Sequence, residues 1–171
     1  QFAGALEQYG VRREERLAMI MRDEIEFPIV FWGCLKAGVV PVPLNTMLST
    51  EVYRAILDDC RASVLVVSHQ LWPVVGPAIA QNPHLRQVIV VGQAVDGTTS
   101  IRDFTKDAKQ LETVSASGDE LAFWLYSSGS TGLPKGVRHI HSSLKATADH
   151  FGRDVIGITQ DDLVYSVAKM F

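Results

Sequence analysis

Short apolar runs alternate along the chain with longer segments in which apolar and polar positions are mixed. The runs have the length and the β-branched content of buried strands. They predict strands at residues 17–21, 39–44, 64–67 and 88–91. The two prolines of the second run, Pro41 and Pro43, favour the edge of a sheet, because proline donates no ladder hydrogen bond. Strands separated by helices indicate an α/β fold, with a mostly parallel sheet and flanking helices.

The segments between these runs carry the start and stop signals of helices. Asp23 is expected to be the N-cap of the first helix. Glu24 and Glu26 would lie in its first turn, where the helix dipole favours acids. Gly38 fits the position just after the end of this helix. The apolar side chains that this helix is expected to direct toward a core are Ile25, Ile29, Phe31, Trp32 and Leu35.

The later segments follow the same logic. Ser49 or Thr50 is expected to cap a helix that runs to about Cys60. The remaining predictions are a helix at 71–79 disturbed by Pro73 and Pro77, a polar loop at 93–100, a short helix from a Ser100 cap through Ala108, a linker at 109–119, and strands at 121–126 and 163–168.

The composition of the 171 residues, 47% apolar and 20% charged, is that of one globular domain. The net charge of −3 and the scattered Lys and Arg form no basic stripe, which argues against nucleic-acid binding. The longest apolar stretch, residues 27–44, is interrupted by Lys36 and by glycines and prolines, so no membrane span is expected. Cys34 and Cys60 lack the spacing of a zinc motif or a disulfide framework. We expect two reduced core thiols in a cytoplasmic protein.

The best candidate for chemistry is the segment from Tyr126 to Gly136, which follows the predicted strand at 121–126. Its glycines let the backbone turn tightly and approach an anion. Its hydroxyls and backbone N–H groups can donate to phosphate oxygens, and Lys135 adds a positive charge on a flexible stem. We therefore predict a phosphate-binding loop with Lys135 as the catalytic residue. The predicted ligand-binding residues are Ser127, Ser128, Gly129, Ser130, Thr131, Gly132 and Lys135.

This loop differs from two common phosphate-binding motifs. A Walker P-loop ends in Gly-Lys-Ser/Thr, whereas here Pro134 precedes the lysine and Gly136 follows it. The G-x-G-x-x-G pattern of a dinucleotide-binding loop does not occur in the sequence. The alternative interpretation is a plain Ser/Gly-rich surface loop. The strand before the loop and the Lys-Gly-Val sequence after it make that alternative less favourable.

The run from Tyr126 to Gly136, YSSGSTGLPKG, is similar to the signature loop of the adenylate-forming superfamily. That superfamily includes acyl-CoA synthetases, luciferases and the adenylation domains of peptide synthetases. The resemblance implies that the loop holds the β- and γ-phosphates of ATP while a carboxylate attacks the α-phosphate. It also implies Mg²⁺ as a cofactor and CoA as a co-substrate.

Segments outside the loop resemble the benzoate–CoA ligase branch of this superfamily. They are Phe31-Trp32-Gly33, Ala37-Gly38, residues 40–46, Phe123-Trp124-Leu125-Tyr126 and residues 166–171. The resemblance implies a partial N-terminal adenylation domain over residues 1–171 and an aromatic carboxylic acid, benzoate or hydroxybenzoate, as substrate. It also implies that the adenine-binding segment, the hinge and the C-terminal lid domain lie outside these residues. The chain alone is therefore expected to be inactive.

Two alternatives stay open. One is a different adenylating enzyme, such as a fatty acyl-CoA ligase or a peptide-synthetase adenylation domain. The other is a non-catalytic nucleotide-binding module that keeps only the loop. The sequence predicts neither the ring substituents of the acid nor the oligomeric state.

A few single residues invite a functional interpretation. His139 and His141 alternate on a predicted strand after Gly136 and could bind a metal. Exposed or hydrogen-bonded imidazoles are favoured, because no third ligand is obvious. Lys169 ends a predicted strand and could approach an active site, although a solvated lysine is slightly favoured. Three tryptophans are expected to be packing residues: Trp32, Trp72 and Trp124.

Overall fold

The computed structural model describes residues 1–127 and 134–170, and its centre is a five-stranded sheet. The strands are β1 (Arg16–Ile20), β2 (Val40–Pro43), β3 (Val64–Ser68), β4 (Gln87–Val91) and β5 (Thr99–Ser100). They lie in the order β2-β1-β3-β4-β5, and every neighbouring pair is parallel. The predicted parallel sheet is therefore confirmed, and the proline-containing β2 lies at its edge as expected.

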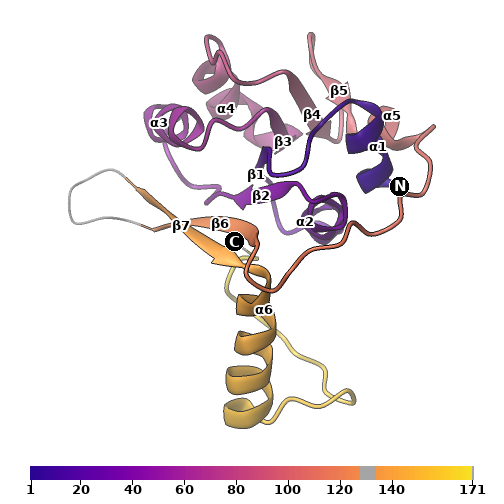
Figure 1. Cartoon of the computed structure of the whole chain (residues 1–171). Coiled ribbons are helices and arrows are strands. Elements are labelled where there is room, and N and C mark those ends of the chain that lie inside the picture. The colour runs from indigo at the N-terminus through magenta and orange to yellow at the C-terminus, as the bar shows by residue number, and fades with distance from the viewer. Residues whose placement is uncertain (128–133, 171) are drawn as a thin grey trace.

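Helices cover both faces of this sheet (Figure 1). They are α1 (Phe2–Gln8), α2 (Glu26–Ala37), α3 (Thr50–Cys60), α4 (Trp72–Ile79) and α5 (Ile101–Thr105), with a 3₁₀ turn, His69–Leu71, before α4. One core contains side chains of α1, α2 and α5, and a second core contains side chains of α3 and α4. Along β1, Leu17 and Met19 belong to the first core, while Ala18 and Ile20 belong to the second. This burial on both faces explains why the run is continuously apolar.

Two predicted helix caps are confirmed by their hydrogen bonds. The Ser49 hydroxyl accepts from the backbone N–H of Val52 at 3.5 Å, which decides between Ser49 and Thr50 as the cap of α3. The Ser100 hydroxyl accepts from the backbone N–H of Asp103 at 3.0 Å. The helix that Ser100 caps is shorter than predicted, because α5 ends at Thr105.

The predicted N-cap of α2 was wrong, although Glu26 lies in the first turn as expected. The helix begins at Glu26, and its N-cap residue, Ile25, makes no side-chain cap bond. Asp23 instead forms an ion pair with Lys169, with 3.3 Å between Oδ2 and Nζ. Glu24 lies before the helix, where it accepts from the Ser68 hydroxyl at 3.5 Å. Local acidity near an apolar segment was thus mistaken for a cap.

The predicted core face of α2 was also largely wrong, although Phe31 packs partly buried against the core as expected. The buried residues are Phe27, Val30 and Cys34, a stripe with helical spacing. Ile25 and Trp32 are 72% and 58% exposed, so they lie on the outer side. The helix is apolar nearly all round, so its periodicity alone could not choose between two possible stripes.

A separate hairpin follows the linker. It consists of β6 (Leu121–Ser127) and β7 (Lys135–Ile140), which pair antiparallel. Strand β6 lies beside β2, and α6 (His141–Thr147) with a π-helical continuation, Ala148–Ile156, extends away from the parallel sheet (Figure 1). The predicted strand at 163–168 is wrong, because that segment has no strand among the described residues to pair with.

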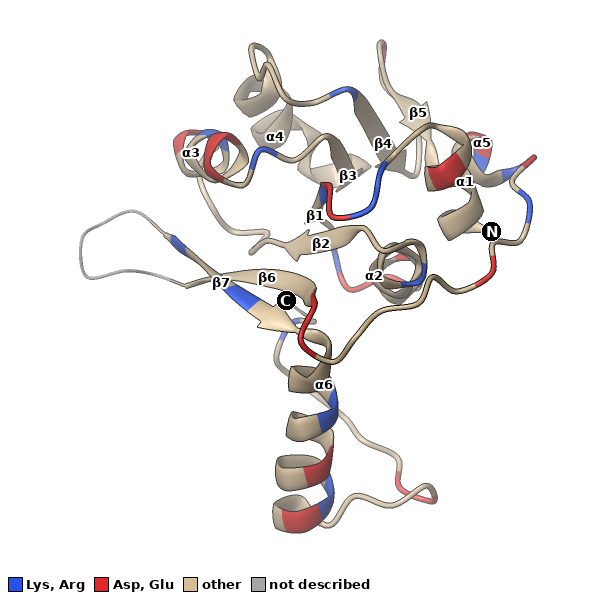
Figure 2. Cartoon of the chain, in the orientation of Figure 1, with Lys and Arg blue, Asp and Glu red and all other residues tan. Residues whose placement is uncertain are grey.

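Charged residues are spread over the molecule. Figure 2 shows basic and acidic segments interleaved, with neither sign collected on one element. Within the described residues no helix combines the length and hydropathy needed to cross a bilayer. Cys34 and Cys60 are buried free thiols, as predicted from the sequence. Burial raises the pKa of Cys60 to about 11, and it also raises the pKa of Cys34.

Candidate functional site

The two ends of the predicted phosphate-binding loop lie opposite each other. Ser127 is the last residue of β6, Lys135 is the first residue of β7, and the two are register partners. Both are exposed, so the hydroxyl and the ammonium group are accessible at the open end of the hairpin. The other predicted ligands lie outside the described residues, and their roles stay predictions: Ser128, Gly129, Ser130, Thr131 and Gly132.

The alternation of side chains along β6 anchors this end of the hairpin. Trp124 and Tyr126 pack against the core formed with α3 and α4. Leu125 and Ser127 line a cavity together with Val137 of β7. A strand presents successive side chains to opposite faces, so the packing of Trp124 and Tyr126 on one face directs Ser127 to the other face.

Two cavities flank the end of β6, and both are lined by Asn45, Tyr126 and Ser127. The first, of about 450 Å³, also contains Pro43 and His139. The second, of about 380 Å³, extends toward α3 and Pro134. The last residues of β6 therefore lie between two cavities, and the hydroxyl of Ser127 is exposed to both. This arrangement can receive a polar ligand.

Sequence reasoning missed Asn45, which follows the carboxyl end of β2. Its side-chain oxygen accepts from the backbone N–H of Met47 at 2.8 Å, which forms an Asx turn. Its backbone carbonyl accepts from the Tyr53 hydroxyl at 2.7 Å, a bond that ties the turn to α3. A polar turn residue directly after a strand at the carboxyl edge of a parallel sheet is the signal that could have found it.

The two histidines do not form a pair on one strand. His139 lies on β7 and stacks on Phe123 of β6, with 4.6 Å between ring centroids and 2° between ring planes. His141 is the first residue of α6, and its backbone N–H donates to the Glu120 carbonyl at 3.0 Å. No set of three metal-ligating side chains is found among the residues that the structure describes. The idea of a histidine metal site gains no support from this geometry.

Lys169, Trp32 and Trp72 lie away from the loop ends, whereas Trp124 is part of β6. Lys169 pairs with Asp23 beyond the carboxyl end of β1 and lines neither cavity beside Ser127. Trp72 packs against the core of α3 and α4, as predicted, whereas Trp32 is mostly exposed. Trp124 also packs there, and its buried indole N–H has no hydrogen-bond partner within the described part of the chain.

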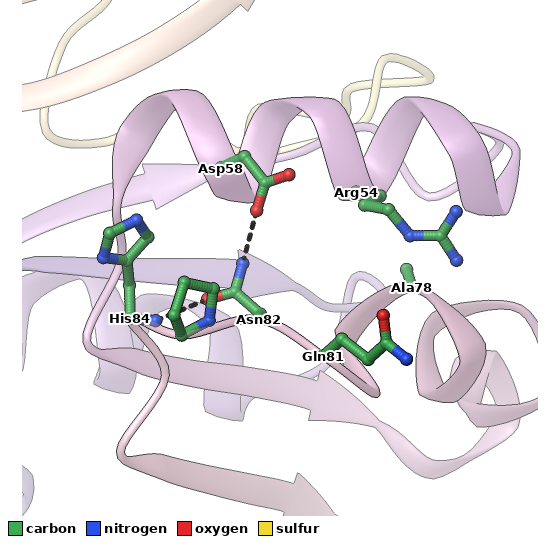
Figure 3. A pocket seen from close by; sticks show the side chains of 7 residues that line it. Arg54, Asp58, Ala78, Gln81, Asn82 and His84 are labelled. Atoms are coloured by element: carbon green, nitrogen blue, oxygen red, sulfur yellow. Dashed lines mark hydrogen bonds between the residues drawn. The ribbon is translucent and has the colours of Figure 1, made fainter.

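A third cavity, of about 330 Å³, lies between α3 and the loop after α4 (Figure 3). Several of its polar groups bond to neighbouring residues. Asn82 donates from its amide to Asp58 at 3.0 Å and accepts from the backbone N–H of His84 at 2.9 Å. Arg54 donates to the Pro77 carbonyl at 3.0 Å. These contacts connect α3 to α4 and to the loop after it.

The sequence matches the profile of the AMP-binding enzyme family over residues 1–171. It is 43% identical to a 4-hydroxybenzoate–CoA/benzoate–CoA ligase of Rhodopseudomonas palustris over 167 residues, which is 97% of this chain and 31% of that protein. It is 32% identical to a long-chain-fatty-acid–CoA ligase of Mycobacterium tuberculosis, over 90% of this chain and 30% of that protein.

The fold is also found in solved structures. The crystal structure of the anthranilate–CoA ligase AuaEII in complex with anthranoyl-AMP superimposes with a TM-score of 0.90 and 32% identity. The superposition covers 94% of this chain and 32% of that protein. The chain therefore spans about a third of the length of the relatives that it matches, and the similarity extends over nearly all of its own residues.

Proposed function

Because this chain belongs to the AMP-binding enzyme family, we propose that it is part of an ATP-dependent ligase that joins an aromatic carboxylic acid to CoA. The whole protein would contain residues 1–171 as part of its N-terminal adenylation domain. The adenine-binding segment and a C-terminal lid domain would lie elsewhere in the polypeptide. The single observation that carries the proposal is the pairing of Ser127 with Lys135 at the mouth of the loop with the superfamily sequence.

This geometry suits the first half-reaction. The substrate carboxylate attacks the α-phosphate of ATP, a P–O bond to the β-phosphate breaks, and acyl-AMP and pyrophosphate form. Negative charge shifts onto the departing phosphates during this step. Lys135 can reach them because its ammonium group is exposed at the end of β7, and Ser127 can donate a hydrogen bond from the opposite strand. Donors that are positioned before the reaction stabilise such charge without reorganisation.

In the second half-reaction the CoA thiol attacks the acyl carbonyl and displaces AMP. No described residue is assigned to this step. Mg²⁺ would bind together with the phosphates of ATP, as this ion usually does in nucleotide sites. We therefore assign it no protein ligand. The buried, unbridged thiols of Cys34 and Cys60 are compatible with a reducing compartment, the cytoplasm.

Two observations support the aromatic substrate over the alternatives. The relative in R. palustris is named for benzoate and 4-hydroxybenzoate, and the solved structure of AuaEII holds anthranoyl-AMP. The identity to the fatty-acid ligase is lower, at 32% against 43%. A pocket shaped for a flat ring gains from stacking and water exclusion, whereas a flexible chain must lose rotamer freedom to enter it.

The test compares acids in the whole protein. Benzoate, cyclohexanecarboxylate and octanoate would each be supplied with ATP, Mg²⁺ and CoA, and kcat/KM would be measured from pyrophosphate release. Cyclohexanecarboxylate is the matched control, because it keeps the carboxylate and the ring size but loses the flat ring. We expect benzoate to be preferred by roughly 10- to 200-fold, the discrimination typical of a hydrophobic pocket. A preference for octanoate would replace the aromatic assignment with a fatty acyl-CoA ligase. No acid-dependent pyrophosphate release with any acid would favour a non-catalytic module.

A further inference from the structure

The last turn of α3 carries two adjacent acids, Asp58 and Asp59. Carboxylates at this end of a helix oppose the helix dipole, which favours cations there. Each of the two has a specific partner elsewhere in the fold. Asp58 accepts from the Asn82 amide, a contact that is visible in Figure 3. Asp59 accepts from the phenol of Tyr126, on a strand that is 67 residues further along the chain.

Tyr126 is well suited to be a permanent donor in this bond. Its ring is half-buried against the core of α3 and α4. Burial, followed by the hydrogen bond to Asp59, raises the pKa of Tyr126 far above its usual range. The phenol therefore keeps its proton at any working pH. A hydrogen bond to an ionised acceptor is stronger than one between neutral groups.

The same tyrosine also contacts β7. Its register partner is Gly136, the residue directly after Lys135. A Cβ atom at Gly136 would lie 3.1 Å from Cζ and 3.2 Å from the hydroxyl oxygen of Tyr126. The missing side chain therefore makes room for the phenol to lie across β7 while it reaches Asp59. One residue beyond this pair, Ser127 and Lys135 form the mouth of the candidate loop.

We propose that Asp59 is a positioning residue for the phosphate-binding loop. The Asp59 carboxylate accepts a hydrogen bond from the phenol of Tyr126, and this bond fixes Tyr126 against its register partner Gly136. The Tyr126–Gly136 pair in turn sets the positions of Ser127 and Lys135. This inference rests on the proposed function for its effect on catalysis. The contact joins the hairpin to α3, so its loss would let the loop mouth move relative to the α/β domain. Small displacements of positioned groups are costly, with 1 Å worth roughly 100-fold in rate.

The experiment uses the whole protein with Asp59→Ala, Asp59→Asn, Tyr126→Phe and the double variant Asp59→Ala/Tyr126→Phe. Asp58→Asn is the matched control, because it removes the neighbouring charge on the same helical turn. We expect Asp59→Ala to lower kcat/KM for ATP on the order of 10-fold in acid-dependent pyrophosphate release. Tyr126→Phe should cause a similar loss, the double variant should lose no more than either single one, and Asp59→Asn should retain part of the activity. Asp58→Asn should stay within twofold of the unmodified protein.

A second readout separates this proposal from the proposed function. Amide hydrogen exchange of the paired ends of β6 and β7 should accelerate in Asp59→Ala and Tyr126→Phe but not in Asp58→Asn, whether or not the protein is a ligase. If the unmodified protein shows no acid-dependent pyrophosphate release, the ligase function is refuted. The exchange measurement alone then tests the positioning role of Asp59. Unchanged exchange in Asp59→Ala, an equal loss in Asp58→Asn, or additive losses in the double variant would each overturn the positioning role.

Discussion

Ser127 and Lys135 are the terminal register partners of β6 and β7, so the pairing of two strands brings together the hydroxyl and the ammonium group that bound the candidate loop. The pairing continues toward the other end of the hairpin through Trp124 opposite Arg138 and Phe123 opposite His139. The position of the loop ends is therefore a property of the whole hairpin. The catalytic hypotheses can be tested at the loop and also at the residues that support it.

Replacement of Lys135 by alanine in the whole protein should slow adenylation. The lysine is expected to stabilise charge on the departing phosphates, and loss of one positioned donor costs roughly 100-fold in kcat. Acid-dependent pyrophosphate release would be measured at saturating acid. Lys106→Ala is the control, because that lysine is exposed and forms an ion pair with Asp103 at 3.9 Å on α5, which carries no predicted ligand. An unchanged rate in Lys135→Ala would mean that the lysine is simply solvated.

Gly136→Ala should destabilise the hairpin. The new methyl group would press on the phenol of Tyr126, which is held by Asp59 and cannot easily move aside. Overpacking of this kind costs about 1–3 kcal/mol in the free energy of unfolding, measured by chemical denaturation. The control is Gly118→Ala, where the added Cβ would lie 3.6 Å from Cβ of Ser142, an ordinary contact. If the hydrogen bond between Tyr126 and Asp59 is the reason, the loss of stability caused by Gly136→Ala should be smaller in the Tyr126→Phe background. Equal losses in both backgrounds would contradict this explanation.

The 171-residue chain by itself should form no aryl-CoA from benzoate, ATP, Mg²⁺ and CoA. It spans 31% of the length of the benzoate–CoA ligase relative that it matches, and the described residues contain no candidate for the thiol step. The measurement is chromatography of the reaction mixture after prolonged incubation, with the whole protein as the positive control. Detectable aryl-CoA above a heat-inactivated sample would show that these residues hold a complete active site.

Stability should fall as the pH rises from about 9 to about 11. Burial raises the pKa of Cys60 from 9.0 to about 11, so within that window the unfolded thiol loses its proton while the folded thiol keeps it. The folded state then binds more protons, and stability decreases with pH, by at most about 1.4 kcal/mol per pH unit for one group. Below pH 9 this contribution to stability is fully present.

Urea unfolding of the chain at pH 8 and at pH 10.5 would measure this effect. Cys60→Ala should be less stable than the unmodified chain at pH 8, because it leaves a small cavity in the core. Its stability should nevertheless fall less steeply between the two pH values, because one titrating thiol is gone. Parallel pH profiles of the two proteins would show that the Cys60 thiol ionises equally in the folded and unfolded states.

Four of the five strands of the parallel sheet could be predicted from the sequence, because each forms a continuously apolar run. The two-residue β5 lies in the segment that was predicted to be a polar loop, so it was missed. A strand covered on both faces is apolar along most of its length, as in residues 64–67 of β3, and that pattern is readable without knowledge of its neighbours. The helix caps at Ser49 and Ser100 were predictable for the same reason, since each cap bond spans three residues. The flanks of the candidate loop followed from a strand that runs directly into glycines and hydroxyls.

Other features depended on contacts between distant residues. Helix α2 offers two apolar stripes, and only its packing against α1 and the sheet selects Phe27, Val30 and Cys34 for burial. The segment at 163–168 has the composition of a strand but no described strand beside it, and a strand requires a hydrogen-bonded neighbour. The hydrogen bond between Asp59 and Tyr126 has no local sequence signature, because no periodicity links two residues so far apart in the chain. The sequence by itself thus indicated most of the elements and the candidate loop, because these depend on local patterns, whereas the tertiary structure decided which faces are buried and which distant residues contact each other.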